Sequence, residues 1–153
     1  ERMKLAELVG DVCERYRSIA EDHNITFHEE TDFSKVPAVV SNPDRVEQLL
    51  VILLDNAIKY TPGGGTVSLD AAWDDARVTL IVKDTGIGIA KEDLPYVFDR
   101  FYKVDKAHSG MGSGLGLSIA KELLKWMGED IWVKSEVGKG TQFGFTLRRD
   151  PTP

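Results

Sequence analysis

The chain has 153 residues, a length that suits one domain with its own hydrophobic core. Its 19 Lys and Arg against 25 Asp and Glu give a formal net charge of −6, which argues against a nucleic-acid-binding module. The single cysteine, Cys13, excludes an intrachain disulfide and a cysteine-based zinc site, and is typical of a reducing compartment. No apolar run approaches the ~20 residues of a membrane span, and no signal-peptide core follows the N-terminus.

Apolar residues at helical spacing predict three helices, over about residues 3–21, 43–60 and 115–127. The second helix has a clear start signal, because polar capping residues and Pro43 precede its apolar face. Thr61-Pro62 and three glycines end it.

Alternating apolar residues predict two antiparallel hairpins, residues 67–73 with 78–82 and residues 131–133 with 143–147. Residues 25–27 read as a short strand, and residues 36–40, broken by Pro37, as an extended piece at a sheet edge. Because β-α-β alternations are few, we expect an α/β (α+β) two-layer sandwich with a mixed, mainly antiparallel sheet and helices on one face.

The common phosphate-binding signatures are absent. A Walker loop fails because Val133 stands where the first glycine should precede Gly138-Lys139, and a dinucleotide pattern starting at Gly112 fails at Leu117. The protein-kinase signatures are also missing, so any nucleotide site must be built differently.

The end of the second predicted helix carries one polar cluster. Asn56, Lys59 and Tyr60 lie three and four residues apart, so they share a face. An amide oxygen, an ammonium and an aromatic ring suit a magnesium-bound phosphate and a flat base, because magnesium takes few protein ligands beside phosphate oxygens and waters. The alternative is a solvated polar helix end.

Asp84-Thr85-Gly86-Ile87-Gly88 follows directly on a predicted strand. A carboxylate held there by a glycine turn accepts a hydrogen bond from an exocyclic amine such as that of adenine; the alternative is a plain turn.

A third cluster, Gly110 to Leu117, holds four alternate glycines at the start of a helix. The free N–H groups of a helix N-terminus hold phosphate oxygens, and the glycines allow the loop to close and open over a ligand. A surface loop is the alternative here, and Gly138-Lys139-Gly140-Thr141 by itself is a hairpin turn.

Taken in this order, the segments resemble the nucleotide-binding boxes of a bacterial sensor histidine kinase, whose catalytic domain shares a superfamily with gyrase, the ninety-kilodalton heat-shock chaperone and the mismatch-repair ATPase. The matching segments are residues 55–62 (N box), 84–89 (first glycine box), 97–105 (F box), 112–117 (second glycine box) and 138–141 (last glycine box). The match covers nearly the whole chain.

The resemblance implies a Bergerat-type sandwich that binds ATP or ADP with Mg²⁺. It implies one domain over residues 1–153, with an opening helix and first strand in residues 1–30 and a mobile lid over residues 99–113. By this resemblance Asn56 ligates Mg²⁺, Lys59 and Lys103 meet phosphates, and Tyr60 lies by the nucleotide. Asp84 binds the adenine amine, and the base pocket is shaped by Gly86, Gly88 and Ile89, with Thr141 near it. The lid edge is formed by Gly112, Ser113, Gly114, Leu115, Gly116 and Leu117. Phe98 and Phe101 resemble the aromatic pair that anchors the lid and docks on the histidine-bearing helices, although ordinary core packing explains Phe98 equally well.

Two departures from the family pattern limit the expected activity. Ile52 stands where the family usually has an asparagine, four residues before Asn56, and no phosphoacceptor-histidine motif exists in the chain. We therefore expect no catalytic nucleophile here and no autophosphorylation by this monomeric fragment.

The leading hypothesis is a domain that donates the γ-phosphate of Mg·ATP to a histidine on a separate dimerisation domain, for later transfer to a response regulator receiver domain. Alternatives are a stand-alone anti-sigma-type serine kinase, a hydrolysing ATPase module and a non-hydrolysing nucleotide-binding interaction module. The leading hypothesis places the domain in the cytoplasm and leaves open an inner-membrane anchor in the parent protein.

Overall fold

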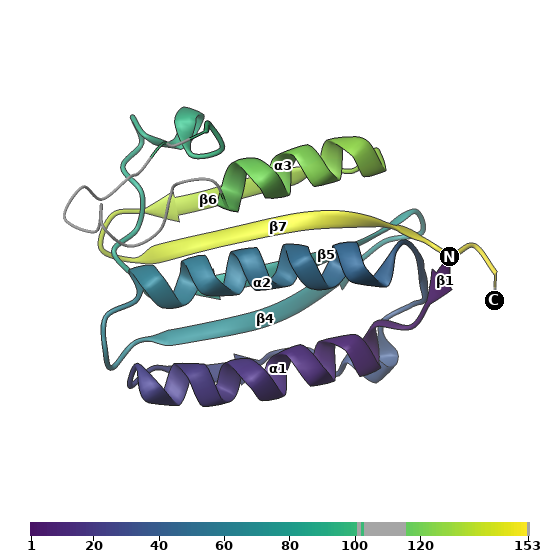
Figure 1. Cartoon of the computed structure of the whole chain (residues 1–153), viewed down its shortest axis with the longest axis horizontal. Coiled ribbons are helices and arrows are strands. Elements are labelled where there is room, and N and C mark those ends of the chain that lie inside the picture. The colour runs from purple at the N-terminus through teal and green to yellow at the C-terminus, as the bar shows by residue number, and fades with distance from the viewer. Residues whose placement is uncertain (101, 103–115, 153) are drawn as a thin grey trace.

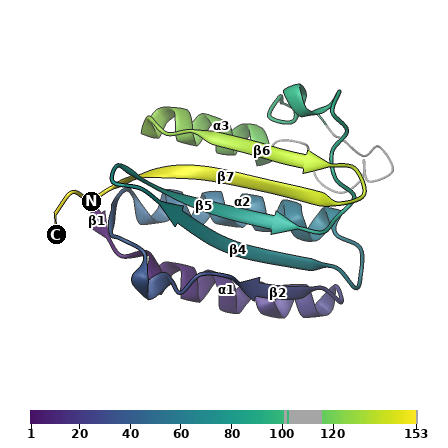
Figure 2. The same cartoon turned by 180° about the vertical axis from the view of Figure 1, so that it is seen from behind.

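The computed structural model describes residues 1–100, 102 and 116–152. In this part of the chain, three helices lie side by side on one face of a single sheet (Figure 1), and the other face is uncovered (Figure 2). The elements in chain order are β1 (Arg2–Met3), α1 (Leu5–Asp22), β2 (Thr26–Glu29), η1 (Phe33–Lys35), β3 (Val39–Val40), α2 (Pro43–Tyr60), β4 (Thr66–Trp73), β5 (Arg77–Asp84), η2 (Leu94–Tyr96), α3 (Gly116–Met127), β6 (Ile131–Glu136) and β7 (Gly140–Arg149). The predicted two-layer α+β sandwich is confirmed.

The helix α2 begins and ends where its sequence signals predict. The side chain of Asn42 accepts hydrogen bonds from the backbone N–H groups of Asp44 and Arg45, and Pro43 occupies the first turn. A cap of this kind stabilises a helix by about 1 kcal/mol. At the other end, the buried hydroxyl of Thr61 donates to the carbonyl oxygen of Ala57, which satisfies one of the last carbonyls of the helix.

The sheet is mixed, with strand order β1-β3-β7-β5-β4-β2, and β6 also pairs with β7. Both predicted hairpins are present, and the parallel pair is β2 with β4. The expectation of an edge strand over residues 36–40 was wrong, because β3 pairs with β1 on one side and β7 on the other. The physical reason is the length of β7: one of its edges takes β6 along residues 140–145 and still has room for β3 at Arg148 and Arg149.

The core lies between the sheet and the helices. Alternate residues of the central strands face the helices and are buried, namely Val67, Leu69, Val78, Leu80, Val82, Phe143, Phe145 and Leu147. Each such side chain contributes about 1.5–3 kcal/mol through removal of apolar surface from water. The two termini lie together at one end of the sheet, and the loop after β5 lies at the opposite end (Figures 1 and 2). This opposite end carries the predicted site.

Candidate functional site

Three segments that are distant in sequence meet at one end of the sheet. The backbone N–H of Ile87, after β5, donates to the carbonyl oxygen of Tyr60 at the end of α2 (3.2 Å). The N–H of Gly138, in the β6–β7 turn, donates to the carbonyl oxygen of Ile87 (2.9 Å). Gly86 also packs closely on α2, because an added Cβ would lie 2.4 Å from the carbonyl oxygen of Tyr60. The N box, the first glycine box and the last glycine box are therefore in direct contact.

Asp84 is the last residue of β5 and stands at the centre of this contact. Its Oδ1 accepts hydrogen bonds from the N–H of Gly86 (2.8 Å) and the N–H of Thr141 (3.2 Å). Burial raises the pKa of the Asp84 carboxyl to about 6, although these two N–H groups act in the opposite direction. No hydrogen bond to Oδ2 is present within the described part of the chain, so this oxygen is available to a ligand donor.

Two glycines allow the loops to approach so closely. Gly88 has φ +77° and Gly140 has φ +118°, in the region that side chains rarely adopt. A Cβ at Gly140 would lie 2.0 Å from the carbonyl oxygen of Asp84, and a Cβ at Gly88 would lie 2.2 Å from that of Glu136. These two positions need glycine for both reasons, which explains why the first and the last glycine box carry glycine there.

The polar cluster of α2 lies at the same end of the sheet. Asn56, Lys59 and Tyr60 are all half-buried, and the side-chain amide of Asn56 makes no hydrogen bond to another described residue. The Lys59 ammonium lies 5.0 Å from the centre of the Tyr60 ring, and burial lowers the pKa of Lys59. No group of three or more His, Cys, Asp or Glu within the described ranges could hold a metal ion by itself.

Ser135 belongs to this site, and sequence reasoning missed it. Its Oγ accepts from the N–H of Ile89 (2.7 Å), lies 2.8 Å from Oγ1 of Thr141 and contacts the carbonyl oxygen of Gly140 (2.9 Å). It therefore connects the two predicted base-pocket residues, Ile89 and Thr141. A signal was present, because Ser135 follows Ile131 and Val133 on the face of β6 toward the helices, where an apolar residue is expected.

The lid edge is described only in part. Gly116 and Leu117 begin α3, and a Cβ at Gly116 would lie 3.5 Å from Cγ2 of Ile52, so the start of α3 packs on α2. Phe98 lies edge-on to Phe143, with ring centres 6.0 Å apart, as its core alternative predicts. The predicted site residues that lie outside the described part of the chain are Phe101, Lys103, Gly112, Ser113, Gly114 and Leu115.

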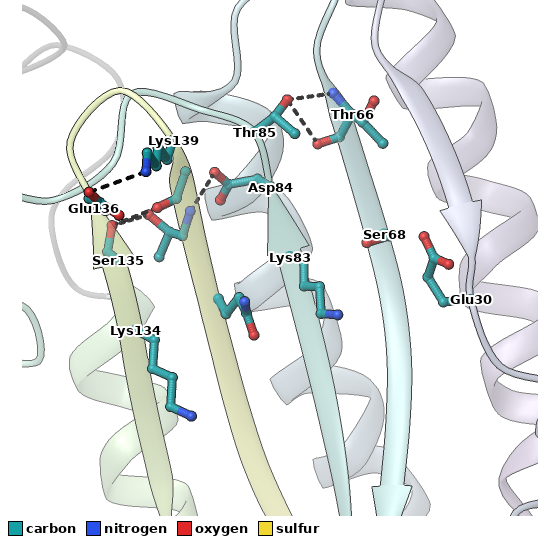
Figure 3. Close-up of a pocket in the computed structure, with 13 residues that line it drawn as sticks. Glu30, Thr66, Ser68, Lys83, Asp84, Thr85, Lys134, Ser135, Glu136 and Lys139 are labelled. Atoms are coloured by element: carbon teal, nitrogen blue, oxygen red, sulfur yellow. Dashed lines mark hydrogen bonds and ion pairs between the residues drawn. The ribbon is translucent and has the colours of Figure 1, made fainter.

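A depression of about 540 Å³ lies on the uncovered face of the sheet and reaches this end (Figure 3). Lys83, Lys134 and Ser68 line it from three strands, and Asp84 and Thr141 also line it. Asn56, Lys59 and Tyr60 do not line it. The depression therefore includes Asp84, Ser135 and Thr141 of the candidate site but not its α2 residues.

The fold and these contacts define a two-layer sandwich with a candidate ligand site at one sheet end, and comparison with known proteins gives the family. Residues 41–151 match the family described as histidine kinase-, DNA gyrase B- and HSP90-like ATPase. The chain belongs to this family, as the resemblance of its motifs predicts.

Its relatives are sensor kinases. The chain is 49% identical over 108 residues to the sensor histidine kinase WalK of Bacillus subtilis, covering 68% of this chain and 18% of WalK. It is 41% identical over 147 residues to the sensor protein SrrB of Staphylococcus aureus, covering 94% of this chain and 24% of SrrB. The chain thus spans less than a quarter of the length of these relatives. None of the described helices is long and apolar enough to cross a membrane.

Solved structures of histidine kinases share the fold. A mycobacterial sensor histidine kinase, MprB, matches with a TM-score of 0.83 at 28% identity, covering 99% of this chain and 100% of that one. Full-length ShkA in complex with AMPPNP matches with a TM-score of 0.84 at 30% identity, covering 100% and 32%. ThkA in complex with the response regulator protein TrrA matches with a TM-score of 0.81 at 26% identity, covering 99% and 42%.

Proposed function

We propose that this chain binds Mg·ATP and donates its γ-phosphate to a histidine on a separate dimerisation domain of a two-component sensor kinase. The complex of the similar protein ShkA with AMPPNP supports an ATP site. Family membership and sensor-kinase relatives support the transfer to histidine.

The observation that carries the proposal is the state of Asp84. Its carboxylate is half-buried at a strand end, Oδ1 is held by two backbone N–H groups, and Oδ2 makes no hydrogen bond to a described residue. Oδ2 is therefore open to a donor from a ligand, and a hydrogen bond to a carboxylate is stronger than one between neutral groups. The exocyclic amine of adenine is such a donor, with Ile89 and Thr141 beside it as walls of the base pocket.

The residues at the end of α2 suit the magnesium ion and the phosphates of Mg·ATP. Half-buried Asn56 has an amide without a described partner, and an amide oxygen is a donor atom that Mg²⁺ accepts beside waters and phosphate oxygens. When bound, Mg²⁺ neutralises charge on the phosphates. The ammonium of Lys59 supplies a further positive charge, and the ring of Tyr60 lies beside it. We assign Lys103 and the glycines of residues 112–116 to the phosphates on the resemblance alone.

Phosphoryl transfer depends mainly on positioning and charge neutralisation, so this domain needs no nucleophile of its own. We assign residues 1–153 to one domain with its lid at residues 99–113, and we assign docking on the histidine domain to the region of Phe98 and Phe101. By analogy with ThkA and TrrA, a response regulator is the later acceptor. On this proposal the domain works in the cytoplasm, where ATP and the regulator are available, whether or not the parent protein has a membrane anchor.

The test is the affinity of the chain for Mg·ATP, measured by titration calorimetry with Asp84→Asn. An amide turned toward the adenine amine sets donor against donor, so affinity should fall about ten- to a hundredfold, the worth of a charge-assisted hydrogen bond. Asp75→Asn, which removes the same charge from the exposed β4–β5 turn, should bind as the wild type does. Equal affinity of wild type and Asp84→Asn would refute the adenine assignment.

A further inference from the structure

The side-chain hydroxyl of Ser135 makes three hydrogen-bond contacts beyond the backbone pairing of its strand. Its Oγ lies within hydrogen-bond distance of the Ile89 N–H (2.7 Å), the Thr141 Oγ1 (2.8 Å) and the Gly140 carbonyl oxygen (2.9 Å). Figure 3 shows Ser135 on β6 and Asp84 on β5 on either side of β7. The Ser135 hydroxyl, like the Asp84 carboxylate, therefore contacts both the first and the last glycine box.

Counting hydrogens fixes the direction of each bond. A hydroxyl has one hydrogen and two acceptor lone pairs, and a carbonyl oxygen only accepts. Ser135 must therefore donate to the carbonyl of Gly140 and accept from the N–H of Ile89. If all contacts are satisfied, the Thr141 hydroxyl donates to Ser135 and turns its own lone pairs elsewhere.

The bond to Gly140 acts on Asp84 through a single peptide unit. The carbonyl of Gly140 and the N–H of Thr141 belong to the same rigid peptide plane. Ser135 holds this plane at the carbonyl, and the N–H on its other side donates to Oδ1 of Asp84 (3.2 Å). Hydrogen bonds in such a chain align and polarise one another, so the first supports the second.

We propose that Ser135 is a positioning residue of the nucleotide site, which holds the Gly140–Thr141 peptide against Asp84 and fixes Ile89 and the Thr141 hydroxyl at the base pocket. The inference rests on the proposed function, because it takes Asp84 as the acceptor for the base. Ser135 itself touches neither the nucleotide nor the phosphates in this proposal.

A consequence for Asp84 separates this role from a general structural one. Burial and the N–H groups of Gly86 and Thr141, rather than a charged neighbour, are the causes of its shifted pKa. The charged residues that line the depression together with Asp84 are Glu30, Lys83, Lys134, Glu136 and Lys139. Removing the Ser135 hydroxyl changes none of these charges, so a further rise of the Asp84 pKa reports a weakened N–H bond from Thr141.

The first experiment measures the Asp84 pKa by NMR titration of its carboxyl carbon in the nucleotide-free chain. Wild type should titrate near 6. Ser135→Ala should raise this pKa by about one pH unit, the scale of one weakened hydrogen bond to a charge, and Ser135→Thr should restore it. Thr79→Ala, which removes a hydroxyl from the same sheet away from this end, should leave it unchanged.

The second experiment measures the affinity of the same variants for Mg·ATP at pH 6.5 and pH 8. Ser135→Ala should bind about tenfold more weakly at pH 6.5 and recover part of the loss at pH 8, where Asp84 is ionised in both proteins. Ser135→Thr should bind as wild type does. A loss that is equal at both pH values and that Ser135→Thr does not rescue would indicate a merely structural role and overturn the proposal.

The two experiments fail separately. A wild-type chain that does not bind ATP refutes the proposed function, while the NMR titration still decides whether Ser135 acts on Asp84. A folded Ser135→Ala chain with an unchanged Asp84 pKa overturns the positioning role. If Ser135→Ala does not fold, Ser135→Cys, with similar volume and a weaker donor, should show the same rise of the pKa, and its absence would count against the proposal.

Discussion

The hydroxyl of Tyr16 on α1 donates a 2.6 Å hydrogen bond to Oδ1 of Asp55 on α2, the residue directly before Asn56. Tyr16 is 3% exposed, whereas Asp55 is exposed to solvent. Burial and this carboxylate raise the pKa of Tyr16 far above its usual value, so the hydroxyl stays a donor at every physiological pH. The hydrogen bond connects the first helix to the N box. Its two partners differ in burial, since the Tyr16 hydroxyl is buried and the Asp55 carboxylate is exposed.

This difference in burial predicts how much stability each single substitution of Tyr16 or Asp55 costs. Tyr16→Phe leaves Asp55 in contact with water, so the free energy of unfolding should fall by only about 1 kcal/mol. Asp55→Ala leaves a buried hydroxyl without its acceptor and should cost more, up to about 3 kcal/mol. Urea unfolding of both single variants and of the double variant measures the difference. A double variant that loses the full sum of the two single losses would show that the bond contributes nothing.

The raised pKa of Asp84 predicts that its ionised carboxylate lowers the free energy of unfolding of the nucleotide-free chain. The pKa is about 6 in the folded chain against an ordinary value of 3.8, so the folded state holds this proton more tightly than the unfolded state does. The stabilising effect of the protonated form is complete below pH 3.8 and is lost as pH rises through about 6. Above that pH the ionised carboxylate costs on the order of 3 kcal/mol.

Asp84→Asn should therefore unfold at higher urea than wild type at pH 7.5 without nucleotide, and the difference should vanish near pH 4. Asp75→Asn serves as the control, since that carboxylate is exposed and its replacement should give no such pH-dependent gain. An Asp84→Asn chain that is less stable than wild type at pH 7.5 would contradict the reasoning.

The β6–β7 turn offers a matched pair of glycine substitutions. Gly138 has φ +80° with nothing within 4 Å of an added Cβ, so Gly138→Ala should cost only the strain of the left-handed conformation, about 1–2 kcal/mol. Gly140 has φ +118°, and its Cβ would meet the backbone of Asp84. Gly140→Ala should cost at least twice as much and displace Asp84, so Mg·ATP affinity should fall in this variant alone. Thermal unfolding and calorimetry check the pair, and equal effects would refute the close contact.

The helices and hairpins were predictable because their signals are local. The apolar stripe and the cap at Asn42 define α2 from neighbouring residues alone, and its bounds agree with the expected 43–60. The Asp84 turn was predictable for the same reason, since a glycine turn after a strand needs no information from elsewhere.

The rest depends on pairings between distant residues. The strand β2 pairs in parallel with β4, and β3 pairs with both β1 and β7. These pairings depend on which strand edges are free once the rest of the sheet has formed. Tyr16 bonds to a partner 39 residues away, and Ser135 reaches Ile89, 46 residues away, besides its neighbours across the β6–β7 turn, so no spacing rule identifies these contacts. The polar residue on an apolar strand face was the one usable sign for Ser135.

The last prediction concerns ATP hydrolysis and decides between a kinase and a hydrolysing ATPase. In the hydrolysing relatives of the superfamily, the resemblance places a glutamate general base four residues before the magnesium-binding asparagine. Here that residue is Ile52, which lies half-buried on α2 against the start of α3 at Gly116. An isoleucine neither accepts a proton nor holds an attacking water, so the step that needs a base has none at this position.

The isolated chain should therefore bind Mg·ATP, release phosphate far more slowly than ~1 per second, and fail to label itself with γ-phosphate. Addition of the histidine-bearing dimerisation domain of its parent protein should give transfer to that histidine, as an acid-labile phosphoramidate. A phosphate-release assay and a labelling assay with and without that domain make the measurement, and Asp84→Asn should abolish the labelling through lost ATP binding. Release at ~1 per second or faster from the isolated chain would mean that another residue serves as the base, and the kinase assignment would then be wrong.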